Sequence, residues 1–143
     1  MVNVMENTIE QFEDLTEAAS LDIAKKAVSV LFQKLAKDIK LIYAAETTVL
    51  TDYYVVAYGR SATHCRALAN ELERVFGACG IPPKHPEGIE SGEWILVDLG
   101  DVIVHIFSRE AGEFYRFEKL FREENFLSVS EIVTENDPST VTE

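Results

Sequence analysis

The segment that most restricts the fold is a long apolar stretch centred on a turn, WILVDLGDVIVHIF, residues 94–107. Gly100-Asp101 at its centre is a two-residue turn of the kind that joins antiparallel strands. A hairpin folded at this turn places six aliphatic residues on one face: Ile95, Val97, Leu99, Val102, Val104 and Ile106. Because that whole face is apolar, it is expected to lie in the core of a sheet, which fixes the register of both strands.

Two polar residues, Asp98 and His105, share the opposite face of this hairpin as diagonal neighbours, about 7–8 Å apart at the backbone. An Asp–His pair is typical of proton transfer, but no serine or cysteine motif supplies a nucleophile beside it. A metal site needs more donors, and His64, His85 and His105 lack ligand spacing. The sequence therefore favours a partly covered face, in which Asp98 and His105 bond to each other or to backbone groups.

The region around Trp94 is locally acidic. Five acidic residues and no basic residue lie between Glu87 and Asp101. An aromatic residue amid negative charge suits docking to a basic protein surface. A solvated loop beside a partly buried Trp94 fits the sequence equally well, so both interpretations stay open at this point.

The remaining chain alternates between helical and strand periodicity. We expect a helix after Ser20, strands at 38–45 and 52–59, a helix capped by Ser61, and a last helix from about Arg109–Arg122. A strand–helix–strand passage indicates a right-handed parallel crossover, and the flanking strands look like antiparallel neighbours. The predicted fold class is α/β (α+β mixed), with a mixed β-sheet of about five strands flanked by helices.

The formal charge of −12 belongs to the two ends of the chain. Residues 1–22 and 123–143 each carry six acidic residues and no lysine or arginine, whereas the middle is neutral. We therefore expect an acidic extension over residues 1–20, one domain over 21–122, and an acidic, disordered tail over 123–143. A broad basic face for direct, sequence-specific nucleic-acid binding is disfavoured.

Three further features favour a cytoplasmic location. No apolar run reaches the roughly 18 residues of a membrane span, so no membrane partner is expected. The acidic N-terminus lacks the pattern of a secretory signal. Cys65 and Cys79 are fourteen residues apart on one predicted helix, too far for a disulfide.

The YGRSATH segment, residues 58–64, lies between a predicted strand and a helix, where backbone N–H groups could hold an anion. Capping by Ser61 explains it more simply. A glycine-serine turn after a strand also occurs in nucleotidyltransferases, which hold magnesium with two carboxylates one residue apart on the next strand. Here the candidate pair, Glu71 and Glu73, lies in a helix, so an enzyme of this kind is disfavoured and no cofactor is expected.

Several segments together resemble the ribosomal silencing factors, the RsfS family, also called the Iojap or YbeB family. They are LTDYYVVAYGRSATH, EGIESGEWILVDLGDVIVHIFSREAGEFYRFEKLF and the helix between them, from about Ala24 to Phe121. The most specific parts are T-D-Y-[FY]-V, W-x-L-x-D-x-G-D-V-x-V-H and Y-x-x-E-x-L. The resemblance implies a mixed sheet related to nucleotidyltransferases but without their catalytic carboxylates. The family commonly has Arg at the position of Gly112, Leu at Phe117 and Trp at Phe121, so a contact of that Arg with Glu118 or the partner would be lost here.

The resemblance also implies a function without catalysis. Members of the family bind the large ribosomal subunit through its fourteenth protein, near the subunit interface, and hinder joining of the small subunit, which represses translation. Several form homodimers, and organelle relatives are linked to large-subunit assembly, which is the alternative function. A nucleotide-binding enzyme that uses the turn at residues 59–61 is less favoured. The residues expected to dock on the ribosomal protein are Glu87, Trp94, Leu96, Asp98, Asp101, His105 and Tyr115.

Overall fold

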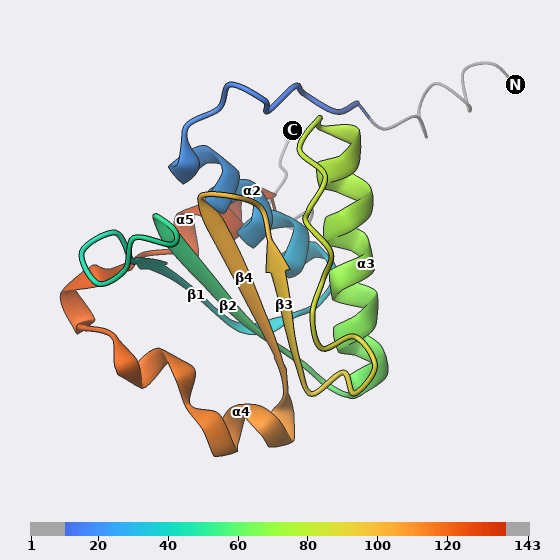
Figure 1. Cartoon of the computed structure of the whole chain (residues 1–143), viewed down its shortest axis with the longest axis vertical. Coiled ribbons are helices and arrows are strands. Elements are labelled where there is room, and N and C mark those ends of the chain that lie inside the picture. Colours follow the sequence, from blue (N-terminus) through green and yellow to red (C-terminus); the bar gives the residue numbers. More distant parts are fainter. Residues whose placement is uncertain (1–10, 137–143) are drawn as a thin grey trace, which may run out of the picture.

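A computed structural model describes residues 11–136, and its centre is one five-stranded mixed sheet in the order β3-β4-β2-β1-β5 (Figure 1). The strands are β1 (Lys37–Tyr43), β2 (Tyr53–Gly59), β3 (Trp94–Asp98), β4 (Val102–Ser108) and β5 (Phe126–Leu127). The helices are α2 (Ser20–Gln33), α3 (Ala62–Ala78), α4 (Arg109–Tyr115) and α5 (Ser130–Asn136), with short 3₁₀ helices η1 (Phe117–Leu120) and η2 (Glu123–Asn125). The predicted fold class, a mixed sheet of about five strands flanked by helices, is confirmed.

The hairpin β3–β4 has the predicted register. Ile95 faces Ile106 and Val97 faces Val104, and the N–H of Leu99 donates to the carbonyl of Val102 over 2.8 Å beside the tip. Gly100 at the tip has φ of +95°, which favours glycine over any residue with a Cβ. All six aliphatic residues of the predicted core face are buried.

The strand pairing differs from the prediction in one respect. The strand β2 pairs in parallel with β4, whereas β3 is antiparallel to β4 and lies at the edge of the sheet. The passage from β2 through α3 to β3 is therefore not a parallel crossover. The burial patterns explain the order: all seven residues of β4 are buried, as in an interior strand, whereas β3 alternates between buried and half-buried residues.

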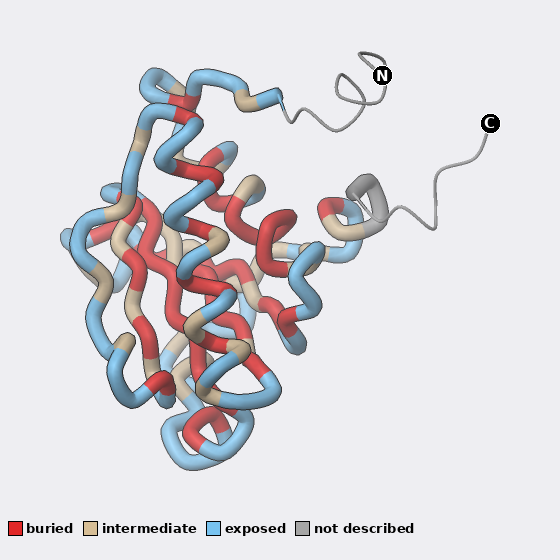
Figure 2. Tube along the Cα trace, turned by 90° about the vertical axis from the view of Figure 1, so that its right-hand side faces the viewer, coloured by how far each residue is buried: buried red, intermediate tan, exposed pale blue. Residues whose placement is uncertain are grey.

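Buried residues are concentrated in the strands of the sheet and on the helix faces that pack against it (Figure 2). Their side chains form two clusters, one on each face of the sheet. The inner cluster lies between the sheet and the helices α2 and α3, and its largest members include Leu31, Leu41, Leu68, Leu72, Phe76, Ile95 and Ile106. The outer cluster lies beneath the α4–η1 segment. Its members are the buried residues Ile42, Val56, Phe107 and Ala111, with the partly buried Tyr54, Tyr58, Trp94, Phe117, Phe121 and Phe126.

The helix ends confirm one predicted cap and correct two other predictions. The Ser61 hydroxyl accepts from the N–H of His64 over 3.1 Å, as expected of the N-cap of α3. Ser20 does not cap α2, because the extended residue is Ala19 and Ser20 already lies within the helix. The last predicted helix ends at Tyr115, since Arg116 adopts the left-handed conformation with φ of 49°, and Phe117 then turns into the outer cluster.

The prediction of disorder after Arg122 is wrong for the part of this segment that the structure describes. The strand β5 pairs with β1, placing Leu127 opposite Leu41 and Phe126 opposite Ile42. The following helix α5 packs near α2, and Ile132 joins the inner cluster. The acidic composition of this segment suggests disorder, but a few apolar residues among the acidic ones, such as Leu127 and Ile132, pack against the core. Residues 137–143 and 1–10 lie outside the described residues.

Cys65 and Cys79 are both free and buried, which confirms the expected absence of a bridge between them. Burial raises the pKa of each thiol, so neither is an activated nucleophile. Among residues 11–136, no helix combines the length and the apolar character needed to cross a bilayer.

Candidate functional site

The edge strand β3 presents Trp94 on the outer face of the sheet. The indole N–H of Trp94 donates to Nδ1 of His105 on the neighbouring strand over 3.0 Å. Its ring also contacts Phe107 and Tyr115, with ring centroids 4.9 and 4.8 Å apart. The half-buried indole is therefore held by one hydrogen bond and by several aromatic contacts, while part of its surface stays open to solvent.

His105 supports this arrangement from beneath. It is 4% exposed, and the ring of Phe117 lies 4.2 Å from it between centroids. Because Nδ1 accepts from Trp94, the neutral imidazole carries its proton on Nε2, which has no hydrogen-bond partner among the described residues. Burial lowers the pKa of His105 to about 4, so the imidazole is uncharged at neutral pH.

Asp98 does not bond to His105, which corrects the first predicted alternative, and the second, a backbone partner, holds for Asp98 alone. One carboxylate oxygen of Asp98 accepts from the backbone N–H of Gly100 over 2.8 Å. The other lies 3.9 Å from the ammonium of Lys84, in an exposed ion pair of small energetic weight. His105 bonds instead to Trp94, the neighbour on the opposite diagonal. The pair therefore lacks the geometry of a proton relay.

The fold brings five of the seven predicted docking residues together: Glu87, Trp94, Leu96, Asp98 and Tyr115. Glu87 and Leu96 exchange two backbone hydrogen bonds of 3.1 and 2.9 Å, which places an exposed carboxylate beside the outer edge of β3. Leu96 follows Trp94 on the same face of the strand, and Tyr115 reaches Trp94 from the end of α4. Asp98 continues this row toward the hairpin tip, where the exposed Asp101 lies. His105 is buried, and its contact with this row is the hydrogen bond from Trp94.

Two aromatic residues of this face, Phe114 and Phe117, are not among the predicted docking residues. Phe114 is 80% exposed, and its ring lies 5.1 Å from that of Tyr115. Phe117 contacts the rings of Tyr54 and Phe121, each at 5.4 Å, in addition to that of His105. Both residues lie within the single helix predicted for 109–122. That prediction does not distinguish the exposed Phe114 from Phe117, which packs into the outer cluster.

The ring of Tyr58 explains why glycine, which has no side chain, stands at position 112. A Cβ at this position would lie 2.1 Å from Cε1 of Tyr58, so no side chain fits while the ring stays in place. The hydroxyl of Tyr58 donates to Glu118 over 2.5 Å. The tyrosine therefore takes the partner suggested for the Arg that the family commonly has at this position.

The acidic pair considered for magnesium binding lies on a helix and not on a strand. Within residues 11–136, no three side chains of the His, Cys, Asp or Glu type converge on a point that could hold an ion. The carboxylates of Glu71 and Glu73 lie on the helix α3, and Glu71 forms an ion pair with Arg74 over 2.7 Å. They do not form the strand-borne pair that a nucleotidyltransferase requires.

The model of one protein family, described as "Ribosomal silencing factor during starvation", matches residues 17–143. The chain belongs to the ribosomal silencing factor family. The match includes the C-terminal segment that the sequence analysis placed outside the resemblance. The silencing factor from Halalkalibacterium halodurans is 32% identical over 100 residues, which is 70% of this chain and 86% of that protein. That from Chromobacterium violaceum is 36% identical over 100 residues, 70% and 82% of the two chains.

Solved structures of two proteins share this family fold. A crystal structure from Bacillus halodurans is 30% identical, with a TM-score of 0.67 over 76% of this chain and 98% of that one. A second, from Chromobacterium violaceum, is 31% identical, with a TM-score of 0.69 over 80% and 98%. A mouse protein named "Mitochondrial assembly of ribosomal large subunit protein 1" is 32% identical over 102 residues, 69% of this chain and 45% of its own length.

Proposed function

We propose that this protein binds the large ribosomal subunit at its subunit-interface side, through the fourteenth protein of that subunit, and sterically blocks joining of the small subunit. Translation is repressed as a result. Membership of the ribosomal silencing factor family supports this proposal. The action requires no bond-making by the protein, because a folded domain seated on the interface excludes the other subunit by its volume. We place this activity in the cytoplasm, and propose that the free protein forms a homodimer.

The observation that carries the proposal is a partly exposed aromatic surface with an acidic rim. We define the docking patch as Glu87, Trp94, Leu96, Asp98, Phe114 and Tyr115. Its centre is apolar, with Phe114 80% and Tyr115 50% exposed. Glu87 and Asp98 border it, and Asp101 extends the acidic rim to the hairpin tip. An aromatic centre with a charged rim is the usual anatomy of a protein interface.

Each part of the patch has its own role in binding. Burying an exposed Phe side chain such as Phe114 stabilises a complex by about 1.5–3 kcal/mol. The acidic rim attracts a basic ribosomal protein and raises the association rate at low salt. Trp94 is held in one orientation by His105, so little of its conformational freedom remains to be lost on docking.

Co-sedimentation with purified large subunits tests the proposal. The variant Phe114→Ser should raise the Kd about tenfold to a hundredfold, since it removes an exposed apolar anchor. Leu50→Ser is the matched control. Leu50 is a similarly exposed apolar residue, at 74%, but it lies in the β1–β2 connection. In a reconstituted joining assay, the native protein should lower the fraction of joined ribosomes and the Phe114 variant should not. Equal effects of both variants, or no binding of the native protein, would contradict the proposal.

The alternative is a factor that assembles the large subunit, which the name of the mouse relative favours. The joining assay separates the two functions when both subunits are mature. A silencing factor prevents joining of mature subunits, whereas an assembly factor leaves it unchanged and acts only on immature particles.

A further inference from the structure

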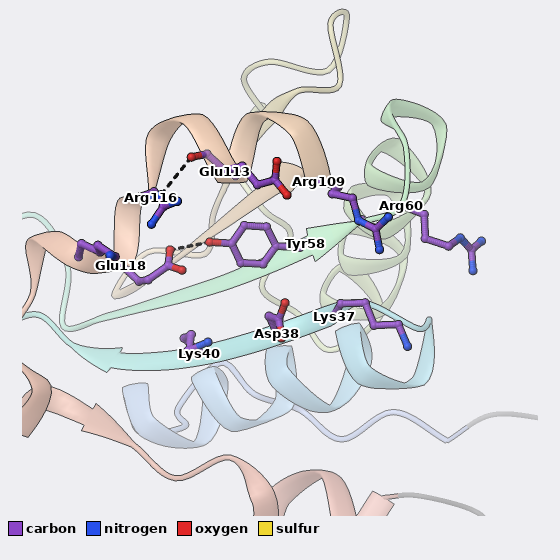
Figure 3. A pocket seen from close by; sticks show the side chains of 12 residues that line it. Lys37, Asp38, Lys40, Tyr58, Arg60, Arg109, Glu113, Arg116 and Glu118 are labelled. Atoms are coloured by element: carbon purple, nitrogen blue, oxygen red, sulfur yellow. Dashed lines mark hydrogen bonds between the residues drawn. The ribbon is translucent and has the colours of Figure 1, made fainter.

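A cavity of about 470 Å³ lies between the strands β1 and β2 on one side and the α4–η1 segment on the other (Figure 3). Its lining includes Lys37, Asp38, Lys40, Tyr58, Arg109 and Arg116. The docking patch and the proposed function do not use this cavity. Its volume is within the usual range of small-molecule sites.

The cavity occupies a special place in the sheet. The parallel neighbours β2 and β4 both end here, at Gly59 and Ser108. The chain then continues from β2 into α3, which packs on the inner face, and from β4 into α4, which packs on the outer face. Two adjacent parallel strands whose connections leave toward opposite faces create a crevice at their carboxyl ends. Ligands of open α/β sheets bind in such crevices.

The cavity is basic in a strongly acidic protein. Six of the thirteen lysine and arginine residues of the chain line it, against three of the twenty-five acidic residues: Lys37, Lys40, Arg60, Arg109, Arg116 and Lys119, with Asp38, Glu113 and Glu118. The formal charge of the lining is therefore +3, while that of the chain is −12. In Figure 3, Arg109 and Asp38 extend into the space between α4 and β1, and Arg60 points away from it. Such concentration of positive charge attracts an anion.

The backbone is irregular on both sides of the cavity. Asp38 and Arg116 each have φ of 49°, and they are two of the three non-glycine residues with positive φ in the described part of the chain. The pairing of β1 with β2 also shifts register between Lys37 and Lys40. Strained residues and β-bulges gather at binding sites, where they aim side chains that a regular strand or helix could not.

We propose that this cavity binds a small molecule that carries a diphosphate or triphosphate, of the size of a mononucleotide. The guanidinium group of Arg109 can fit phosphate oxygens through paired N–H donors. Arg116 adds a positive charge and its terminal N–H groups, since its Nε–H donates to the carbonyl of Glu113. The carboxylate of Asp38 can accept hydrogen bonds from hydroxyl or amino groups elsewhere on the ligand. An RNA backbone fits less well, because the three carboxylates and the acidic remainder of the protein repel a long polyanion.

Isothermal titration calorimetry of the full chain with ADP and with GDP tests this inference. We expect saturable 1:1 binding of at least one of them, weakened by added salt. Arg109→Gln should raise the Kd about tenfold or more, because it removes a charge-assisted contact. Lys25→Gln is the matched control, since Lys25 is also an exposed cation, lies on the helix α2 and does not line this cavity. Melting curves check that both variants are folded.

Three results would overturn the inference. The first is the absence of saturable heat with either nucleotide. The second is an equal loss of affinity in the Arg109 and Lys25 variants, which would indicate diffuse charge attraction. The third is binding of a ten-nucleotide RNA with no binding of ADP or GDP, which would assign the basic cavity to a nucleic-acid surface. None of these depends on ribosome binding, so the docking proposal can fail or hold separately.

Discussion

The buried imidazole of His105 should make the stability of this protein fall on mild acidification. Its pKa is about 4 in the folded chain because of burial, whereas an unfolded chain has the ordinary histidine pKa of about 6.5. Between these values the unfolded chain binds a proton that the folded chain does not. The contribution of the neutral His105 to the free energy of unfolding is therefore complete above about pH 6.5 and is lost as the pH falls toward 4.

The two pKa values set the size of the effect. Linkage gives a loss of about 2 kcal/mol in the free energy of unfolding between pH 7 and pH 5, and about 3 kcal/mol in total by pH 4. Because the side chain is only 4% exposed, solvent screens it little. Protonation would also place a donor on Nδ1, where Trp94 now donates, and break that hydrogen bond.

Urea denaturation at several pH values measures the effect. Trp94 is the single tryptophan of the chain and contacts His105 directly, so its fluorescence reports on this region. The control is His105→Gln, which keeps an acceptor for the indole N–H but does not titrate. Subtracting the two pH profiles removes the contribution of the carboxylates. If the profiles of the native protein and the variant ran parallel between pH 7 and pH 5, the reasoning would be refuted.

Two other features are tested, each by a substitution and a matched control. Gly112→Ala should lower the free energy of unfolding by about 1–3 kcal/mol, because its Cβ overlaps the Tyr58 ring. The control is Gly77→Ala on α3, which should raise the free energy of unfolding by about 0.5–1 kcal/mol, since nothing lies within 4 Å of the new Cβ. Equal effects of the two variants in denaturation curves would disprove the overlap with Tyr58. Glu87→Lys should weaken large-subunit binding about threefold to tenfold at low salt and flatten its salt dependence, whereas Glu73→Lys on α3 should not. Sedimentation at several salt concentrations distinguishes them.

The hairpin could be predicted because two independent signals agree. A turn at Gly100-Asp101 and the period of two in the flanking residues specify the same register, and the structure has it. The last helix could not be predicted in full, because its end depends on the left-handed conformation of Arg116. No local residue preference demands that conformation. Packing of Phe117 into the outer cluster favours it, and this contact exists only in the folded chain.

Strand geometry alone does not determine which neighbouring side chain bonds to His105. On the outer face, His105 lies opposite Leu96, so Trp94 and Asp98 are its two diagonal neighbours. Both side chains can reach a histidine, and the spacing favours neither. The turn decides, since the backbone N–H of Gly100 provides a nearby donor for Asp98 and leaves His105 to the indole. Strand spacing thus predicts which of these three residues are neighbours, but not which of them bond.

The two-residue strand β5 has a consequence for work with shortened chains. It closes the margin of the sheet opposite the hairpin by covering Leu41 and Ile42 of β1. A chain trimmed after Arg122, at the boundary that its charge distribution suggests, would leave these backbone groups open to strand addition by a neighbouring molecule. Self-association of such a fragment would then reflect pairing through the uncovered strand β1. The oligomeric state should therefore be determined on a chain that keeps β5.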